Sequence, residues 1–240
     1  REVADGGGHR GDQRPPYRAA WRLLRWAADN RNDLDGRLHL AGLNGGARAY
    51  VDPTADSPYR MAQLDVTSTP EGSAKLTTEP ITYYNDGRTL VLEWDVRTHT
   101  AITGEGDMTY LGAVEFSNGA AWDRYFGFIF APESNENIGY TILGAVGTVT
   151  FSDVAIATST TYRLRLEICG ADNHDGANML GRWFINGTFI NEVTSATISP
   201  DLVRIAHTLT NGADNPNDAY RVYVGPQRAS WNHSNDNDAI

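Results

Sequence analysis

Cysteine and lysine are almost missing from this chain of 240 residues, in which Cys169 is the only cysteine and Lys75 the only lysine. A single cysteine excludes an intramolecular disulfide and any metal site that needs paired thiolates. We interpret it as a small buried apolar residue and not as a nucleophile. No apolar run approaches the ~20 residues of a membrane-spanning helix, so the sequence predicts no membrane span.

Positive charge is also scarce, because the formal net charge is -10 at pH 7. Residues 1–37 carry eight arginines against six acidic residues, whereas the remainder carries twelve cationic residues against twenty-four acidic ones. An acidic surface repels a polyanion, so we expect no nucleic-acid partner for the main body. The basic first segment suits an acidic partner, including another copy of the same chain.

The first segment differs from the rest of the chain in its pattern as well. Residues 1–16 contain three consecutive glycines and a proline pair, which predicts a flexible arm. In residues 17–30 the apolar side chains recur at helical spacing, which predicts one short amphipathic helix. Three arginines lie largely off its apolar face and are predicted to dock on a partner subunit: Arg18, Arg22 and Arg25. We therefore expect an arm and helix over residues 1–36 and a β domain over residues 37–240.

From residue 37 onward, short runs of β-branched and aromatic residues alternate with Gly, Asn, Asp and Pro. No helical pattern interrupts them, which favours an all-β fold with two antiparallel sheets packed as a sandwich. The predicted strands cover residues 37–43, 47–51, 60–66, 89–98, 109–117, 124–131, 139–144, 148–157, 161–168, 181–187, 188–193, 202–207 and 219–225.

The stretch "GRWFINGTFI" predicts a β-hairpin at residues 181–190. An Asn-Gly pair such as Asn186-Gly187 favours a type I′ turn, because both central positions of that turn need a positive φ. The period of two in a strand sends Trp183 and Phe184 to opposite faces. We expect Trp183 to pack between the sheets and Phe184 to face a second layer or a groove.

Residues 160–225 resemble the late strands of concanavalin A-like jelly rolls, and of laminin-G-like domains in particular. The resemblance rests on an aromatic-rich strand, an Asn-Gly turn and a terminal Asp-x-x-Arg-Val-Tyr strand formed here by Asp218, Arg221, Val222 and Tyr223. It implies a jelly roll over residues 37–240. It does not imply one activity, because that superfamily includes lectins, glycan-binding modules, polysaccharide lyases, glycoside hydrolases and virion proteins.

Paired carboxylates are the main signal for catalysis. A retaining glycosidase needs two carboxylates about 5 Å apart. Glu93 and Asp95 occupy alternate positions of a predicted strand and therefore share one face. Arg97 follows at the next alternate position, which favours an ion pair on a solvated strand over catalysis. A polysaccharide-degrading enzyme that uses Glu93 and Asp95 stays an alternative.

Glycan binding needs an exposed aromatic ring for the apolar face of a sugar, with polar groups nearby for its hydroxyls. The stretch "SNGAAWDRYFG" supplies both around a predicted loop. The predicted ligand-binding residues are Trp122, Tyr125, Asn118, Asp123 and Arg124.

Calcium is the one cofactor that the sequence suggests. Loops rich in Asp and Asn offer the oxygen ligands that this hard cation takes. The acids predicted to bind it are Asp172, Asp175, Asp214 and Asp218.

Together these patterns favour a noncatalytic domain that binds a glycan, such as a cell-surface polysaccharide. The alternative is a structural or decoration subunit of a virion or other extracellular assembly, which docks on its neighbours or on further copies of itself through residues 1–36. Either function predicts an extracellular or virion-associated location.

Overall fold

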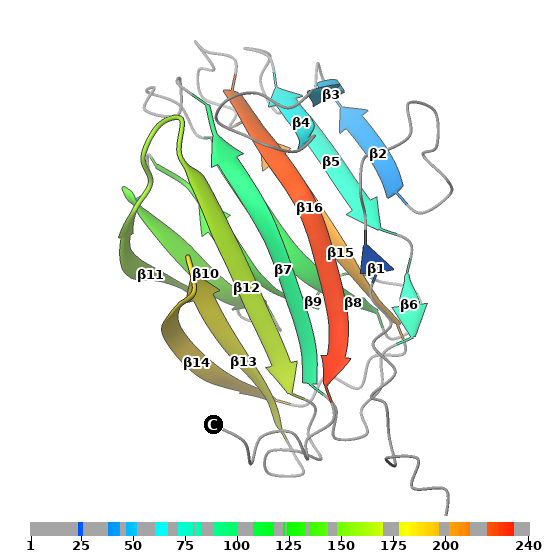
Figure 1. The fold of residues 1–240 in the computed structure, drawn as a ribbon, viewed down its shortest axis with the longest axis vertical. Coiled ribbons are helices and arrows are strands. Elements are labelled where there is room, and N and C mark those ends of the chain that lie inside the picture. Colours follow the sequence, from blue (N-terminus) through cyan, green and yellow to red (C-terminus); the bar gives the residue numbers. More distant parts are fainter. Residues whose placement is uncertain are drawn as a thin grey trace, which may run out of the picture.

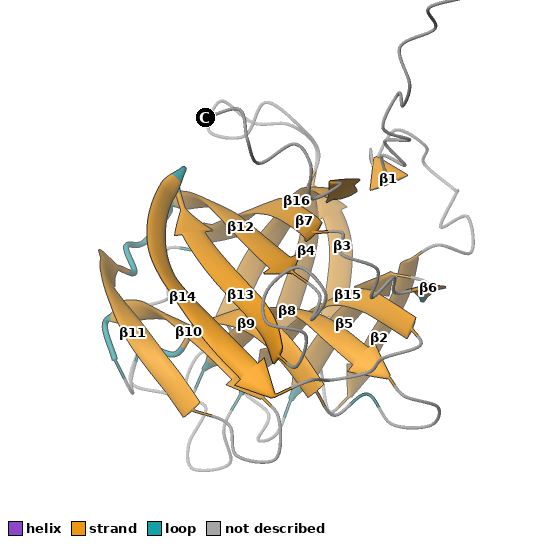
Figure 2. Cartoon of the chain, turned by 90° about the horizontal axis from the view of Figure 1, so that it is seen from below, coloured by secondary structure: helices purple, strands orange, loops and turns teal. Residues whose placement is uncertain are grey.

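The computed structural model consists of two antiparallel β-sheets packed face to face, which Figure 2 shows as two layers. It describes residues 24–25, 38–43, 47–51, 61–66, 72–78, 80–82, 89–99, 108–117, 122, 124–132, 135–143, 148–169, 178–196, 202–211 and 220–232. Every regular element in these residues is a strand, which confirms the predicted all-β sandwich. The same residues contain no helix with the length and hydropathy needed to cross a membrane.

The front sheet is the one nearer the viewer in Figure 1, and β7 and β12 lie near its middle. Its strands follow the order β14 (Thr188–Ala196), β13 (Asn178–Ile185), β12 (Thr161–Cys169), β7 (Thr89–Thr98), β16 (Tyr220–Asn232), β4 (Met61–Val66) and β3 (Ala47–Val51), and β1 (Leu24–Arg25) pairs with β16.

The back sheet lies behind it and has β8 at its centre. Its strands follow the order β11 (Thr148–Ala155), β10 (Asn137–Leu143), β9 (Arg124–Phe130), β8 (Thr109–Ser117), β15 (Leu202–Thr210), β5 (Ser73–Thr78) and β2 (Leu38–Leu43), and β6 (Ile81–Thr82) pairs with β15.

Each predicted strand exists, and β7 and β8 have the predicted limits. β5 was not predicted, because "SAKLTT" is mostly polar and Leu76 is its one large apolar side chain. Its buried side chains are Ala74, Leu76 and Thr77, and the other three positions are polar and half-buried. Pairing with β15 and β2 on its two sides holds this polar segment in the sheet.

The predicted amino-terminal helix is wrong at two of its residues. Leu24 and Arg25 form β1, whose register places them opposite Ala229 and Arg228 of β16. At that point β16 extends beyond its pairing with β4, so its edge offers backbone groups that a strand satisfies and a helix does not. The rest of the predicted arm and helix, including Arg18 and Arg22, lies outside the described residues.

The core lies between the sheets and follows from the alternation in each strand. In β7 the residues Leu92, Trp94 and Val96 point inward and are buried. Phenylalanines of β9 meet them from the back sheet, and Phe128 packs edge-on against Trp94 with ring centroids 5.8 Å apart. Burying a side chain of this size contributes roughly 1.5–3 kcal/mol, so these aromatic contacts help to hold the two layers together.

The hairpin between β13 and β14 has the predicted turn. Asn186 and Gly187 adopt φ values of 52° and 81°, as a type I′ turn requires. Trp183 is fully buried, and its indole nitrogen donates a 3.0 Å hydrogen bond to the carbonyl oxygen of Gly127 in the back sheet. The predicted core position of Trp183 is therefore confirmed, and Phe184 points to the opposite face.

Candidate functional site

The solvent side of the front sheet carries a row of side chains that crosses five strands. We call this surface the front face and the row the central row. Neighbouring members are cross-strand partners, and from β14 to β16 the row consists of Phe189, Phe184, Arg165, Glu93 and Arg228. Strands lie about 4.8 Å apart, so the row extends over about 19 Å. It joins aromatic, cationic and anionic groups in one line.

Two phenylalanines form the aromatic end of the central row. Phe189 follows the hairpin turn and is 51% exposed, an unusual position for a large apolar side chain. Its ring meets that of Phe184 edge-on at 5.5 Å. The guanidinium of Arg165 lies 5.1 Å from the centroid of the Phe184 ring, within the range of a cation-π interaction. We call the two phenylalanines the aromatic platform. Phe189 is its exposed end, and Phe184 contacts the guanidinium of Arg165 at its other end.

Glu93 and Asp95 lie beside this platform, on the front face as predicted. The Nε of Arg163 donates a 3.1 Å hydrogen bond to Oδ1 of Asp95 from the neighbouring strand. This bond raises the pKa of Arg163, because it favours the charged guanidinium. Asp95 therefore forms an ion pair with Arg163 of β12, a residue that the sequence did not indicate. The predicted ion pair with Arg97 of the same strand stays a prediction.

The far end of the front face, toward β4, combines a second ion pair with aromatic groups. Arg221 reaches Oδ2 of Asp65 with its Nη2 at 2.7 Å and its Nε at 3.2 Å. His99 lies beside Tyr223, with ring centroids 6.3 Å apart. Burial lowers the pKa of His99, and the positive charge of Arg221 lowers it further. The negative charge of Asp65 raises the pKa in part, and the net shift is downward.

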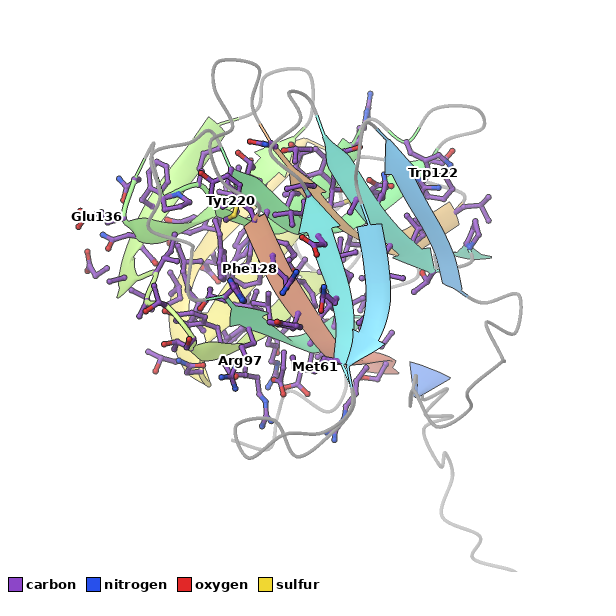
Figure 3. All side chains as sticks on the ribbon, turned by 90° about the horizontal axis from the view of Figure 1, so that it is seen from above. Met61, Arg97, Trp122, Phe128, Glu136 and Tyr220 are labelled. Carbon is purple, nitrogen blue, oxygen red and sulfur yellow. The ribbon has the colours of Figure 1, made fainter. Side chains whose placement is uncertain are left out.

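The predicted glycan anchors lie on the opposite surface of the protein. Figure 3 shows Trp122 and Arg97 on opposite sides of the sandwich, with Phe128 between them. The guanidinium of Arg204 lies 4.1 Å from the centroid of the Trp122 ring, which leaves at most one ring face for a sugar.

Trp122 therefore belongs to a charged cluster on the outer side of the back sheet. Glu115 lies between two cations, with Lys75 Nζ at 2.8 Å and Arg204 Nε at 2.6 Å. Tyr125 is the cross-strand partner of Glu115. Burial raises the pKa of Tyr125, and the charge of Glu115 raises it further. The structure thus brings Trp122 and Tyr125 together around an acid that is already paired.

One further predicted ligand-binding residue is described, and it is not brought to either surface cluster. Arg124 begins β9 and is the cross-strand partner of Phe116. The described residues contain no group of three or more His, Cys, Asp or Glu side chains suited to a metal ion. The remaining predicted ligands lie outside the described residues: Asn118, Asp123, Asp172, Asp175, Asp214 and Asp218.

No protein-family model and no curated protein matches the chain. Solved structures match its fold. The metal-free carbohydrate recognition domain of Emp46p has a TM-score of 0.56 at 10% identity, over 86% of this chain and 92% of that one. An endo-1,3-β-glucanase from Streptomyces sioyaensis has a TM-score of 0.57 at 10% identity, over 83% of this chain and 90% of the enzyme. The metal-free lectin I-B4 from Griffonia simplicifolia has a TM-score of 0.51 at 13% identity, over 84% and 96% respectively.

These likenesses establish a concanavalin A-like jelly roll, which confirms the fold that the sequence resemblance implied. At identities this low they establish the fold alone, because one fold carries both lectins and enzymes.

Proposed function

We propose that the chain is a noncatalytic carbohydrate-binding domain and that a glycan lies across the front face. The observation that carries this proposal is the central row, in which the exposed ring of Phe189 continues into charged side chains on adjacent strands. The structural likeness to a carbohydrate recognition domain and to a lectin supports it. A function of this kind suits a protein that works outside the cell.

Each part of the central row matches one part of a sugar. The apolar C–H face of a pyranose packs on an aromatic ring, which Phe189 offers next to Phe184. Sugar hydroxyls need both donors and acceptors, which Arg165 and Glu93 supply from neighbouring strands. The row of about 19 Å has room for several sugar units in line.

A glycan-array screen tests the proposal, with the purified chain applied once with calcium and once with a chelator. We expect reproducible binding that Phe189→Ala weakens at least about fivefold, since the loss of an aromatic anchor costs over about 1 kcal/mol. Trp122→Ala is the matched control on the back sheet and is expected to keep full binding. Loss of binding in Trp122→Ala alone would move the site to the back sheet.

The two buffer conditions address the predicted calcium site. Binding that disappears in the chelator supports an ion near the glycan, and the first variants to make would then replace Asp172 and Asp214. A blank array in both conditions contradicts glycan binding. It would leave the assembly subunit, whose oligomeric state should then change when residues 1–36 are removed.

A polysaccharide-degrading enzyme is the second candidate, because Glu93 and Asp95 share the front face and one structural match is a glucanase. The hydrogen bond from Arg163 counts against it, since it commits Asp95 to an ion pair. Incubation with 1,3-β-glucan and measurement of reducing ends separate the two functions. We expect no release of sugar, whereas activity that Glu93→Gln abolishes would establish the enzyme.

A further inference from the structure

We infer that the front face selects an acidic polysaccharide, one that carries carboxylate or sulfate groups along its chain. This inference rests on the proposed glycan binding and names the class of glycan. The observation behind it is that the arginines in the ion pairs of the front face are more exposed than the acids they contact.

The arginines of these ion pairs reach solvent, and their acids lie beneath them. Among the ion pairs between described residues of this face, three show the same order in side-chain exposure: Arg163 at 64% over Asp95 at 9%, Arg165 at 39% over Glu167 at 13%, and Arg221 at 33% over Asp65 at 17%. The fourth pair, on the outermost strands β13 and β14, has the opposite order, with Arg182 at 36% and Glu192 at 52%. A ligand on the central strands therefore meets guanidinium groups first.

The balance of charge on this face differs from that of the chain. On strands β4, β7, β12, β13, β14 and β16 the front face carries six arginines, namely Arg97, Arg163, Arg165, Arg182, Arg221 and Arg228, against five acids, namely Asp65, Glu93, Asp95, Glu167 and Glu192. The whole chain has a formal net charge of -10. A surface with a slight cationic excess on so acidic a protein makes this face the favoured one for an anionic ligand.

The guanidinium groups also keep donors for a ligand. A guanidinium has five N–H donors in a planar fork. In the ion pairs found here Arg163 reaches Asp95 through Nε, and Arg165 reaches Glu167 through Nη2. The remaining N–H groups at the tips of these side chains match the two oxygens of a carboxylate or sulfate group, whereas Nε of Arg165 is buried away from a ligand. The buried acids hold the arginines in place, so little side-chain freedom is lost on binding.

Affinity electrophoresis and isothermal calorimetry in calcium-free buffer test the inference. The probes are polygalacturonate, dextran sulfate and neutral dextran, each at low and at high NaCl. We expect the protein to bind at least one polyanion, to bind neutral dextran at least about tenfold more weakly, and to lose affinity at high salt as screened charges do. Binding to polygalacturonate or to dextran sulfate alone would identify the recognised group as carboxylate or sulfate.

Three variants locate the site. Arg163→Gln and Arg228→Gln should each weaken polyanion binding at least about fivefold. Arg228 is exposed and forms no ion pair with the described residues, so its replacement tests the inference even where Arg163→Gln disturbs folding. Arg124→Gln in the back sheet is the matched control and should bind as the original chain does.

Each other outcome overturns the inference in a recognisable way. Equal, salt-insensitive binding of neutral and acidic polysaccharides would refute acidic selectivity and leave glycan binding intact. If Arg124→Gln weakened polyanion binding as much as Arg228→Gln does, the binding would be a general electrostatic attraction and not a site on the front face. Absence of binding to every glycan, on the array as well as here, would remove the proposed function itself.

Discussion

His207 is fully buried between the sheets, and its burial predicts a loss of stability in mild acid. Its Nδ1 lies 2.9 Å from the hydroxyl oxygen of Tyr110, and its ring packs edge-on against Trp94 at 5.5 Å. Removal from water disfavours the imidazolium and lowers the pKa of His207 to about 3, although the side chain of Gln227 acts in the opposite direction. The unfolded chain releases the imidazole to water, where its pKa returns to about 6.5.

The size and sign of the effect follow from these two pKa values. Because the folded pKa is the lower one, protonation favours the unfolded chain, and the contribution of His207 to stability is complete only above about pH 6.5. Between about pH 6.5 and pH 3 each unit of pH removes about 1.4 kcal/mol from the free energy of unfolding. Acidification from pH 7 to pH 5 should therefore cost about 2 kcal/mol through this residue alone.

Urea unfolding at pH 7 and at pH 5 measures this loss, with His207→Gln as the reference protein. Glutamine does not titrate, and its amide can still bond to the hydroxyl of Tyr110. The other five of the six histidines are common to both proteins, so their contributions cancel. We expect the original chain to lose about 2 kcal/mol more than the variant on acidification. Equal losses in the two proteins would refute the argument from burial.

Three substitutions test the packing. Gly181→Ala would bring a methyl group within 2.6 Å of Phe126 and 2.7 Å of Trp183, so thermal unfolding should show a loss of about 1–3 kcal/mol; an unchanged Tm would contradict this close approach. Gly187→Ala meets no atom within 4 Å and should cost only the 1–2 kcal/mol or so of its positive φ, and a larger loss would reveal a contact at the turn. Trp183→Phe removes the indole hydrogen bond to the carbonyl of Gly127 and leaves a gap in the core, so it should cost about 1–3 kcal/mol in urea unfolding, and no loss would mean that this bond is dispensable.

The sequence predicts most of the fold because strand alternation is a local property. The limits of β7 and β8, the turn at Asn186-Gly187 and the inward position of Trp183 all follow from residues close together in the chain. The helix over Leu24 and Arg25 fails because a strand edge far along the chain decides their conformation. Helical periodicity carries no information about such a partner.

The candidate site is harder to predict because cross-strand register creates it. Phe184, Arg165 and Glu93 come from three strands, and only the pairing of β13, β12 and β7 aligns them. One feature of the sequence could have indicated the site. Phe189 is a large apolar residue directly after a tight turn, a place where a side chain is expected to be exposed. Trp122 looked exposed from its polar neighbours, but Arg204 from another strand lies over its ring.

Lys75 gives the protein a single lysine for site-specific chemical coupling. It is the only lysine, and it lies on the outer side of the back sheet, where it reaches Glu115 and keeps a third of its side chain exposed. Apart from the terminal amine, an amine-reactive linker therefore has one place to attach. A sensor surface or bead coupled through Lys75 would hold the protein with its arginine-bearing sheet turned toward the solution.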